Sequence, residues 1–190
     1  MTSLLDQFRR VGRDLYAADL VSSHGGNMSV RPGEAIVITT HGSRLGHLTQ
    51  ADLVEVTQAI LPPGGRVAEP SMDLALHRAI YAAVPQAQAV VHAHPRHAIA
   101  LSLVSNEIRP RDLEGRHYLG LVPIVAGDGD VAAALAATLA AALRQHKIAV
   151  VAGHGSYAWG EDLWQALQWT SVLEESAQVL WLLRVLTGES

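Results

Sequence analysis

Short apolar runs alternate with segments of helical spacing along this chain, and this alternation restricts the folds that it can adopt. The runs with strand character are AIVITT, AQAVVHAH, LGLVPIVA and KIAVVAGHGSYAW. Helices that alternate with strands pack as layers over the faces of a sheet. We therefore expect an α/β fold, a sandwich built around a mixed sheet.

Several helix starts are marked in the sequence. Apolar residues at helical spacing predict an amphipathic helix over residues 3–20. Thr49 is expected to cap a helix start, with Asp52 at the third helical position as an acidic variant of the capping box. Ser71 is expected to cap the next helix, MDLALHRAIYAAV, and Pro95 to stand at the first helical position of RHAIALSLV.

Glycine, proline and asparagine mark the turns. A short extended piece at residues 28–30, a turn at 32–33 and the run AIVITT together predict a hairpin. The remaining expected features are a turn at 62–65, an alanine-rich helix opened by Asp128 or Asp130, and a last helix over residues 161–186.

The size and composition of the chain limit its organisation. Its 190 residues, 49% of them hydrophobic, can bury a substantial core, and we expect a single domain over residues 1–190. The chain has no cysteine. This excludes disulfides and thiolate ligands, so any metal site must use His together with Asp or Glu.

The charge of the chain argues against two classes of partner. The net charge is -4 and the isoelectric point is near 6.2, with Lys and Arg scattered and outnumbered. Such a surface does not attract nucleic acid or an anionic membrane, so we expect a small molecule or another protein as the partner. The N-terminal segment carries charges throughout, and no uncharged run reaches the roughly 18 residues of a membrane span. We expect a soluble, cytoplasmic protein.

Three histidines stand where apolar strands end. His92 and His94 are two residues apart, so both side chains lie on one face if the strand continues through position 94. His154 ends a second apolar run and has glycine on both sides. Three histidines with an open fourth position are a common arrangement for catalytic zinc. The alternative is that these are polar residues where strands meet loops.

The other histidines have weaker patterns. His77 follows Asp73 by one helical turn, and it either holds that carboxylate or packs in the core; we favour the first. His97 is expected to face the opposite side of a helix start, and His117 and His146 are expected on the surface. Three more lie in glycine-rich loops, where they either touch a ligand or face solvent: His24, His41 and His47.

Five motifs along the chain occur in the same order in one known family. They are SSHGGNMSVR, VITTHGSRLGHLTQADLVEV, PSMDLALHRAIY, AVVHAHPRHAIALS and AGHGSYAWGEDLWQAL. Over most of its length the chain thereby resembles the class II aldolase/adducin proteins. The resemblance implies a three-layer αβα sandwich with a central mixed, largely antiparallel sheet. It also implies a homotetramer with sites at subunit interfaces.

The resemblance further implies a divalent metal, usually zinc, held by His92, His94 and His154. Histidine and carboxylate ligands suit Co²⁺, Mn²⁺ and Fe²⁺ as well. In the family's aldolases a glutamate serves as acid/base and sometimes as a metal ligand, and Asp73 stands at its position. Aspartate is one methylene shorter, so its carboxylate must reach farther or act through water.

The resemblance also indicates where an anionic substrate group binds. The family's aldolases hold a phosphate with an Asn, a Ser/Thr-Gly pair and two serines, and Asn27, Gly42 and Ser71 match this pattern. His41 and Met72 replace hydroxyl-bearing residues, which weakens the case for phosphate specifically.

Two features still favour an anion. A protonated His41 can donate a charge-assisted hydrogen bond. The helix start expected at Ser71 and the glycine-rich loop at Gly25 and Gly26 offer backbone N–H groups.

The family's aldolases also use two tyrosines, one of them from a C-terminal tail of a neighbouring subunit. This chain stops at Ser190, directly after its last predicted helix, so we expect no tail tyrosine. The middle segment offers Asp112, Glu114 and Tyr118, and the sequence does not select one of them as the proton donor.

The resemblance implies an enzyme, a metal-dependent lyase that catalyses aldol or retro-aldol cleavage of a keto-sugar or keto-sugar phosphate through a metal-stabilised enediolate. A decarboxylase, dehydratase or epimerase that uses the same metal site is the alternative. A third class is a non-catalytic, adducin-like interaction domain. Members of that class lose the metal ligands, whereas this chain keeps three histidines and a carboxylate.

Overall fold

The computed structural model describes residues 3–57, 69–127 and 132–188. The strands of these residues are β1 (Asn27–Val30), β2 (Ile36–Thr39), β3 (Leu53–Val56), β4 (Ala89–Ala93), β5 (Glu107–Ile108), β6 (Val122–Val125), β7 (Ile148–Val151) and β8 (Gly155–Gly160). The helices are α1 (Leu4–Ala17), α2 (Leu74–Ala83), α3 (Arg96–Ser102), α4 (Leu113–Tyr118), α5 (Ala132–Leu143) and α6 (Leu163–Thr187), with short 3₁₀ turns η1 (Leu45–His47) and η2 (Gln50–Asp52).

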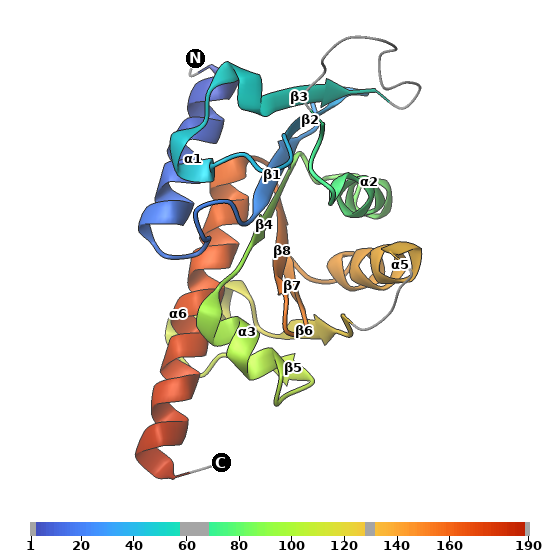
Figure 1. The fold of residues 1–190 in the computed structure, drawn as a ribbon. Helices are drawn as coiled ribbons and strands as arrows, with labels where there is room; N and C mark the ends of the chain where they lie inside the picture. The colour runs from blue at the N-terminus through green and yellow to red at the C-terminus, as the bar shows by residue number, and fades with distance from the viewer. Residues whose placement is uncertain (1–2, 58–68, 128–131, 189–190) are drawn as a thin grey trace.

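The elements form three layers (Figure 1). The sheet has the strand order β3-β2-β1-β4-β8-β7-β6-β5. Helices α1, α3, α4 and α6 cover one face of the sheet, and α2 and α5 cover the other. Neighbouring strands run antiparallel except β6 and β7, which are parallel. The expected αβα sandwich with a mixed, largely antiparallel sheet is confirmed.

The middle of the sheet is buried on both faces. Val91 of β4 packs with Phe8 and Leu173 on the α1 and α6 side, while its neighbour Val90 packs with Ile80 on the α2 side. Both valines are fully buried. Successive side chains of a strand point to opposite faces, so a strand between two helical layers is apolar at nearly every position.

The register of three adjacent strands aligns the residues of the candidate site. Asn27 of β1 pairs with His92 of β4, and His92 pairs in turn with Tyr157 of β8. Residues directly opposite one another in a ladder point to the same face. Three polar side chains from distant parts of the sequence are therefore brought together in one row across the sheet.

The first and second expected helices differ in the structure. The helix predicted over 3–20 ends at Ala17, because Asp19 has a left-handed backbone (φ 56°) that an α-helix does not accommodate. The capping box at Thr49 forms, but it closes only the 3₁₀ turn η2. The helix expected there is wrong: Val54 and Val56 are buried on either side of an exposed residue, and the segment is strand β3.

Two helix caps also differ from prediction. Asp73, not Ser71, is the cap residue of α2, because the chain makes one further turn before the helix begins. Pro95 is the cap residue of α3 and not its first helical residue. The elements β5 and α4 were not predicted. The turn expected at 62–65 and the helix start expected at Asp128 or Asp130 lie outside the described residues.

The run KIAVVAGHGSYAW forms two strands and not the single strand that was predicted. Strands β7 and β8 are antiparallel and joined by a tight turn over residues 152–154. Gly153 makes this reversal possible, because its φ of 68° is a conformation that other residues rarely adopt. His154 consequently lies in the turn and precedes β8.

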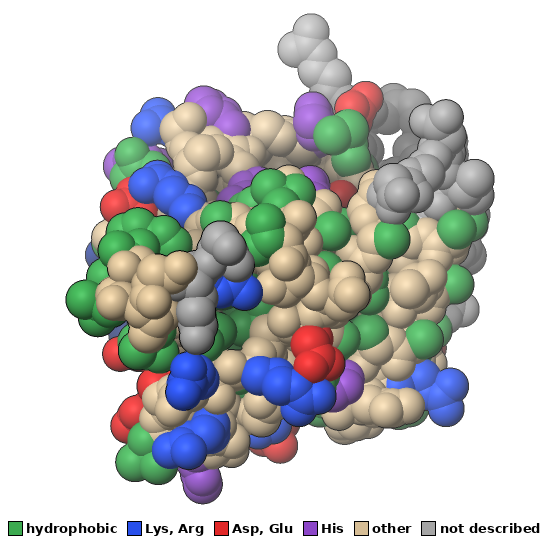
Figure 2. Space-filling model, turned by 90° about the horizontal axis from the view of Figure 1, so that it is seen from below, with side chains coloured by type: hydrophobic (Ala, Val, Ile, Leu, Met, Phe, Trp, Pro, Cys, Tyr) green, Lys and Arg blue, Asp and Glu red, His purple; other side chains and the backbone are tan. Residues whose placement is uncertain are grey.

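Two further features are the distribution of surface charge and the length of the helices. On the face shown in Figure 2, acidic side chains stand among the basic ones. Of the helices in the described residues, none is long and apolar enough to cross a bilayer.

Candidate metal centre and acid/base site

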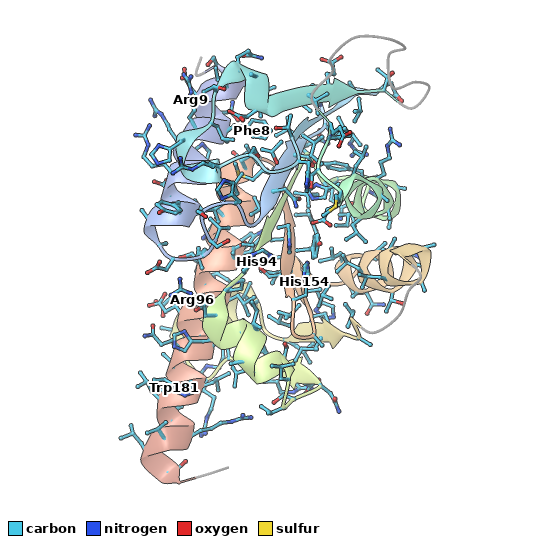
Figure 3. All side chains as sticks on the ribbon, viewed as in Figure 1. Phe8, Arg9, His94, Arg96, His154 and Trp181 are labelled. Carbon is cyan, nitrogen blue, oxygen red and sulfur yellow. The ribbon has the colours of Figure 1, made fainter. Side chains whose placement is uncertain are left out.

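Three histidines from two parts of the sheet meet at one edge. His92 is in β4, His94 follows that strand directly, and His154 lies in the turn between β7 and β8. One ring nitrogen from each lies within 4.8 Å of those of the other two, and Figure 3 shows His94 and His154 near each other. Strands β4 and β7 are both antiparallel to β8, so their carboxyl ends share one edge. The sequence prediction that these three side chains converge is met.

The donor atoms have the arrangement that a metal requires. The Nε2 atoms of His92 and His94 are 3.0 Å apart. Two ligands of a tetrahedral zinc, each at about 2.0–2.1 Å from the ion, stand about 3.3 Å from one another. His92 Nδ1 lies 3.0 Å from the carbonyl oxygen of Ser156, and donation of its proton to that carbonyl leaves Nε2 with a free lone pair. This donor set fits a divalent cation.

Burial keeps the imidazoles of His92 and His94 in the neutral form that binds metals. Burial lowers the pKa of His92 to about 3, and His94 and His154 lower it as well, although Asp73 opposes them. Burial is also the main cause of the lowered pKa of His94. His92 is buried, His94 half-buried and His154 exposed. The three-histidine group is therefore open to solvent on the His154 side.

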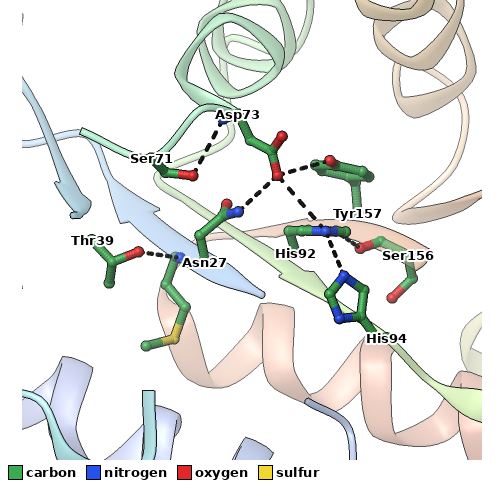
Figure 4. A network of polar contacts seen from close by, with 9 residues as sticks. Asn27, Thr39, Ser71, Asp73, His92, His94, Ser156 and Tyr157 are labelled. Carbon is green, nitrogen blue, oxygen red and sulfur yellow. Dashed lines mark hydrogen bonds and ion pairs between the residues drawn. The ribbon is translucent and has the colours of Figure 1, made fainter. Parts of the chain in front are cut away.

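Asp73 lies beside this group and is held by two donors (Figure 4). Its Oδ2 accepts hydrogen bonds from the Asn27 amide at 2.7 Å and from the Tyr157 hydroxyl at 3.0 Å. The same Oδ2 is 3.7 Å from His92 Nε2. Burial raises the pKa of Asp73, but His92, His77 and the two hydrogen bonds lower it by more, so the carboxyl group has a pKa below its usual value.

Asn27 and Ser71 both contact Asp73. Because the Asn27 amide already donates to Asp73, only its second N–H is available to a ligand, and its Oδ1 is buried without a partner among the described residues. Ser71 Oγ accepts from the backbone N–H of Asp73 at 3.2 Å, which leaves its own proton free to donate. The structure thus places both predicted substrate-binding side chains next to Asp73.

Two further predicted substrate-binding residues, His41 and Gly42, lie in a segment that neighbours the segment of Ser71. His41 and Gly42 follow β2 and are exposed. The backbone N–H of His41 bonds the carbonyl oxygen of Glu69, and that of Ser71 bonds the carbonyl oxygen of Thr39, so the two segments run side by side.

Two glycines let the backbone approach the histidines closely. Gly26 has a φ of 76°, and a side chain there would meet the carbonyl oxygen of His92 at 2.8 Å. A side chain at Gly155 would lie 2.4 Å from the carbonyl oxygen of Ala93 and 2.8 Å from the His94 ring. These contacts explain why glycine is required at both positions.

Tyr157 is a residue of this candidate site that the sequence analysis missed. Its ring stacks on the His92 ring, with centroids 4.2 Å apart and planes 13° apart, and burial raises the pKa of its hydroxyl. The middle-segment candidates lie elsewhere: Asp112 caps α4, and Tyr118 packs against Trp169. The glycines around His154 signal a tight turn, and recognising that turn would have placed Tyr157 on the strand beside His92.

His77 does not hold Asp73. It is fully buried, and its Nδ1 is 2.7 Å from the Ser29 hydroxyl, which in turn is 2.8 Å from the hydroxyl of Tyr81. Burial lowers the pKa of His77 to about 4. The role favoured from the sequence is wrong, and the core alternative is the one observed. His97, near the start of α3, is half-buried and bonds Glu174.

The chain is similar to known proteins of one family. Residues 6–181 match the model of the class II aldolase and adducin N-terminal domain. An L-fuculose phosphate aldolase from Methanocaldococcus jannaschii is 32% identical over 173 residues, which are 91% of this chain and 93% of that protein. A methylthioribulose-1-phosphate dehydratase from Acidiphilium cryptum is 35% identical over 169 residues, covering 80% of this chain and 78% of the dehydratase.

A solved structure is similar over nearly the whole fold. The crystal structure of the L-fuculose-1-phosphate aldolase from Thermus thermophilus superimposes with a TM-score of 0.89. The two chains are 40% identical, and the match covers 98% of this chain and 97% of the other.

Proposed function

This chain belongs to the class II aldolase and adducin family, and we propose that it is a metal-dependent lyase that makes or breaks a carbon–carbon bond in a keto-sugar or keto-sugar phosphate. The observation that carries the proposal is the convergence of three imidazole nitrogens within 4.8 Å of one another, with the Asp73 carboxylate beside them. The relatives named above are lyases, which supports an enzymatic role.

We assign His92, His94 and His154 as the metal ligands. When bound, a divalent metal supplies a Lewis acid that polarises the substrate carbonyl. Zinc is the ion that we propose, and Co²⁺, Mn²⁺ or Fe²⁺ suits the same ligands. The open side at His154 leaves room for a substrate to reach the centre.

We assign Asp73 as the acid/base that moves a proton at the substrate carbon next to the carbonyl. Its low pKa keeps it ionised at neutral pH, as a base requires. Asn27 and Tyr157 occupy Oδ2 and hold the group in one orientation, so Oδ1 is the oxygen left to exchange a proton with the substrate.

We propose that the anionic end of the substrate binds between the segment that holds His41 and Gly42 and the segment that holds Ser71. The Ser71 hydroxyl and the second N–H of Asn27 are free to donate there. Gly26, His41 and Gly42 complete the proposed subsite with backbone N–H groups and an imidazole. This assignment keeps an anionic substrate without requiring a phosphate.

A second candidate is a dehydratase, because several relatives bear that name and the same carboxylate can remove a proton to start loss of water. Decarboxylation and epimerisation draw on the same groups. The three retained histidines argue against a non-catalytic, adducin-like role.

The assay that tests the proposal supplies the metal-loaded enzyme with keto-sugar phosphates, unphosphorylated keto-sugars, methylthioribulose 1-phosphate and keto acids, and identifies the products. Aldehyde and ketone fragments that form with wild-type enzyme and not with Asp73→Asn support the lyase. Loss of water, loss of carbon dioxide or inversion without cleavage would replace it by the corresponding alternative.

We further propose that residues 1–190 form one domain and that the protein acts in the cytoplasm as a homotetramer, as the family resemblance implies. Size determination in solution tests the last point. The proposed partner is a small-molecule substrate, and we propose neither a nucleic acid nor a membrane as a partner.

A further inference from the structure

Helix α3 touches two of the three histidine positions, one at each end. His94 is separated from its first residue only by Pro95, and its last residue, Ser102, lies against the turn that carries His154. The rings of His94 and His154 have their centroids 5.5 Å apart. The position of α3 therefore influences the separation of these two side chains.

The N-terminal end of α3 is fixed by a residue of another helix. The cap residue Pro95 has no side-chain acceptor, so the first turn lacks the capping group that Ser, Thr, Asp or Asn usually supplies. Glu174 of α6 supplies it. Its carboxylate accepts from the backbone N–H groups of His97 at 3.0 and 3.1 Å and of Ala98 at 3.2 Å, and it lies 2.8 Å from His97 Nδ1.

The C-terminal end of α3 is fixed to the β7–β8 turn. Ser102 is buried, and its hydroxyl accepts from the backbone N–H of Gly153 at 3.0 Å while it donates to the carbonyl oxygen of Ile99 at 2.6 Å. Gly153 directly precedes His154. The hydroxyl thus connects the last turn of α3 to the backbone of a proposed ligand.

We propose that Ser102 and Glu174 are positioning residues for the metal centre, because they hold the two ends of α3 and thereby set the separation of His94 and His154. The inference rests on the proposed function in that it assumes a metal on the three histidines. Neither residue touches the ligand side chains, so their effect is on the geometry of the site and not on the chemistry of the donors.

Metal affinity is sensitive to such geometry. Removal of groups that orient ligands typically lowers metal affinity about 10–100-fold. A bond length of about 2.0–2.1 Å leaves little tolerance for a shift of one ligand against another. Loss of the Glu174 cap frees the first turn of α3, and loss of the Ser102 hydroxyl frees the backbone before His154.

The test compares Glu174→Ala and Ser102→Ala with two matched exposed controls, Glu175→Ala and Ser171→Ala. For each protein, competition with a chromophoric chelator gives the dissociation constant for Zn²⁺. The visible absorption of the Co²⁺-substituted protein reports ligand geometry, which a general loss of stability does not alter. Thermal unfolding of the metal-free proteins identifies any variant that fails to fold, and Glu174→Gln, which keeps one acceptor oxygen, then replaces Glu174→Ala.

We expect Zn²⁺ affinity to fall about tenfold in each test variant, with an altered Co²⁺ spectrum, and to stay unchanged in both controls. Folded test variants with wild-type affinity and spectrum would overturn the inference while leaving the proposed metal centre intact. A wild-type protein that binds neither ion would instead refute the metal centre, so the two failures are distinguishable.

Discussion

The Tyr157 hydroxyl donates a hydrogen bond of 3.0 Å to Asp73 while the Tyr157 ring stacks on His92. One side chain thus contacts both the proposed acid/base and a proposed metal ligand. Tyr157 is fully buried, so it cannot reach a substrate itself. Its effect on the reaction is expected to come through the orientation of the carboxylate.

Replacement of Tyr157 by Phe keeps the ring and removes the donated hydrogen bond. Loss of a hydrogen bond to a charged group costs about 1.5–3 kcal/mol, so we expect kcat to fall about tenfold or more with little change in KM or metal content. Steady-state kinetics and metal analysis test this, with Tyr16→Phe on the exposed face of α1 as the control. Unchanged kcat in Tyr157→Phe would show that Asn27 alone suffices to orient the carboxylate.

Replacement of Asp73 by Asn removes the group that we propose moves the proton and keeps a side chain of similar size. General acid–base groups contribute about 10²–10⁴-fold, so we expect kcat to fall at least about a hundredfold. The three histidines are unchanged, and the variant should therefore retain its metal. Turnover near the wild-type rate would assign the proton transfer to another group.

The metal-free protein should lose stability as the pH falls below about 6.5. His77 has a pKa of about 4 in the folded state, against about 6.5 when unfolded, so the unfolded chain binds more protons between these values. By linkage, His77 alone lowers the free energy of unfolding by about 2 kcal/mol at pH 5. Urea unfolding at pH 7.5 and pH 5 measures it. The His77→Leu variant should lose less stability over this range than the wild type, and equal losses would contradict the assignment.

Substitution of Gly155 by Ala should disrupt the site, because the new methyl group would meet the Ala93 backbone at 2.4 Å. We expect a loss of about 2 kcal/mol or more together with weaker metal binding. Gly120→Ala is the control: nothing lies within 4 Å of that position, and only its φ of 65° opposes the change, at a cost of about 1 kcal/mol. Equal destabilisation of the two variants would refute the close contact.

The sequence predicted the fold class and the three histidines because both follow from local patterns. Strand and helix periodicity fixes the layers. Histidines at the ends of apolar runs converge when those runs share an edge. The order of strands and their register depend on contacts between distant residues, which no local pattern encodes.

The same limit explains the errors at the site. The pairing of β4 with β8 places Tyr157 opposite His92, and the sequence interpretation merged β8 into β7. The spacing of His77 from Asp73 suggested a contact, whereas the α2 helix directs His77 toward Ser29 in the core. The capping box at Thr49 formed as predicted, but the alternation of Val54 and Val56 with exposed Glu55 favours a strand after it.

Elemental analysis of natively purified protein tests the central claim most directly. The metal centre predicts about one divalent metal per chain in the wild type, since three histidines supply one tetrahedral site. It predicts none in the His92→Ala/His94→Ala double variant. Wild-type protein without metal, or equal metal content in both proteins, would contradict the account.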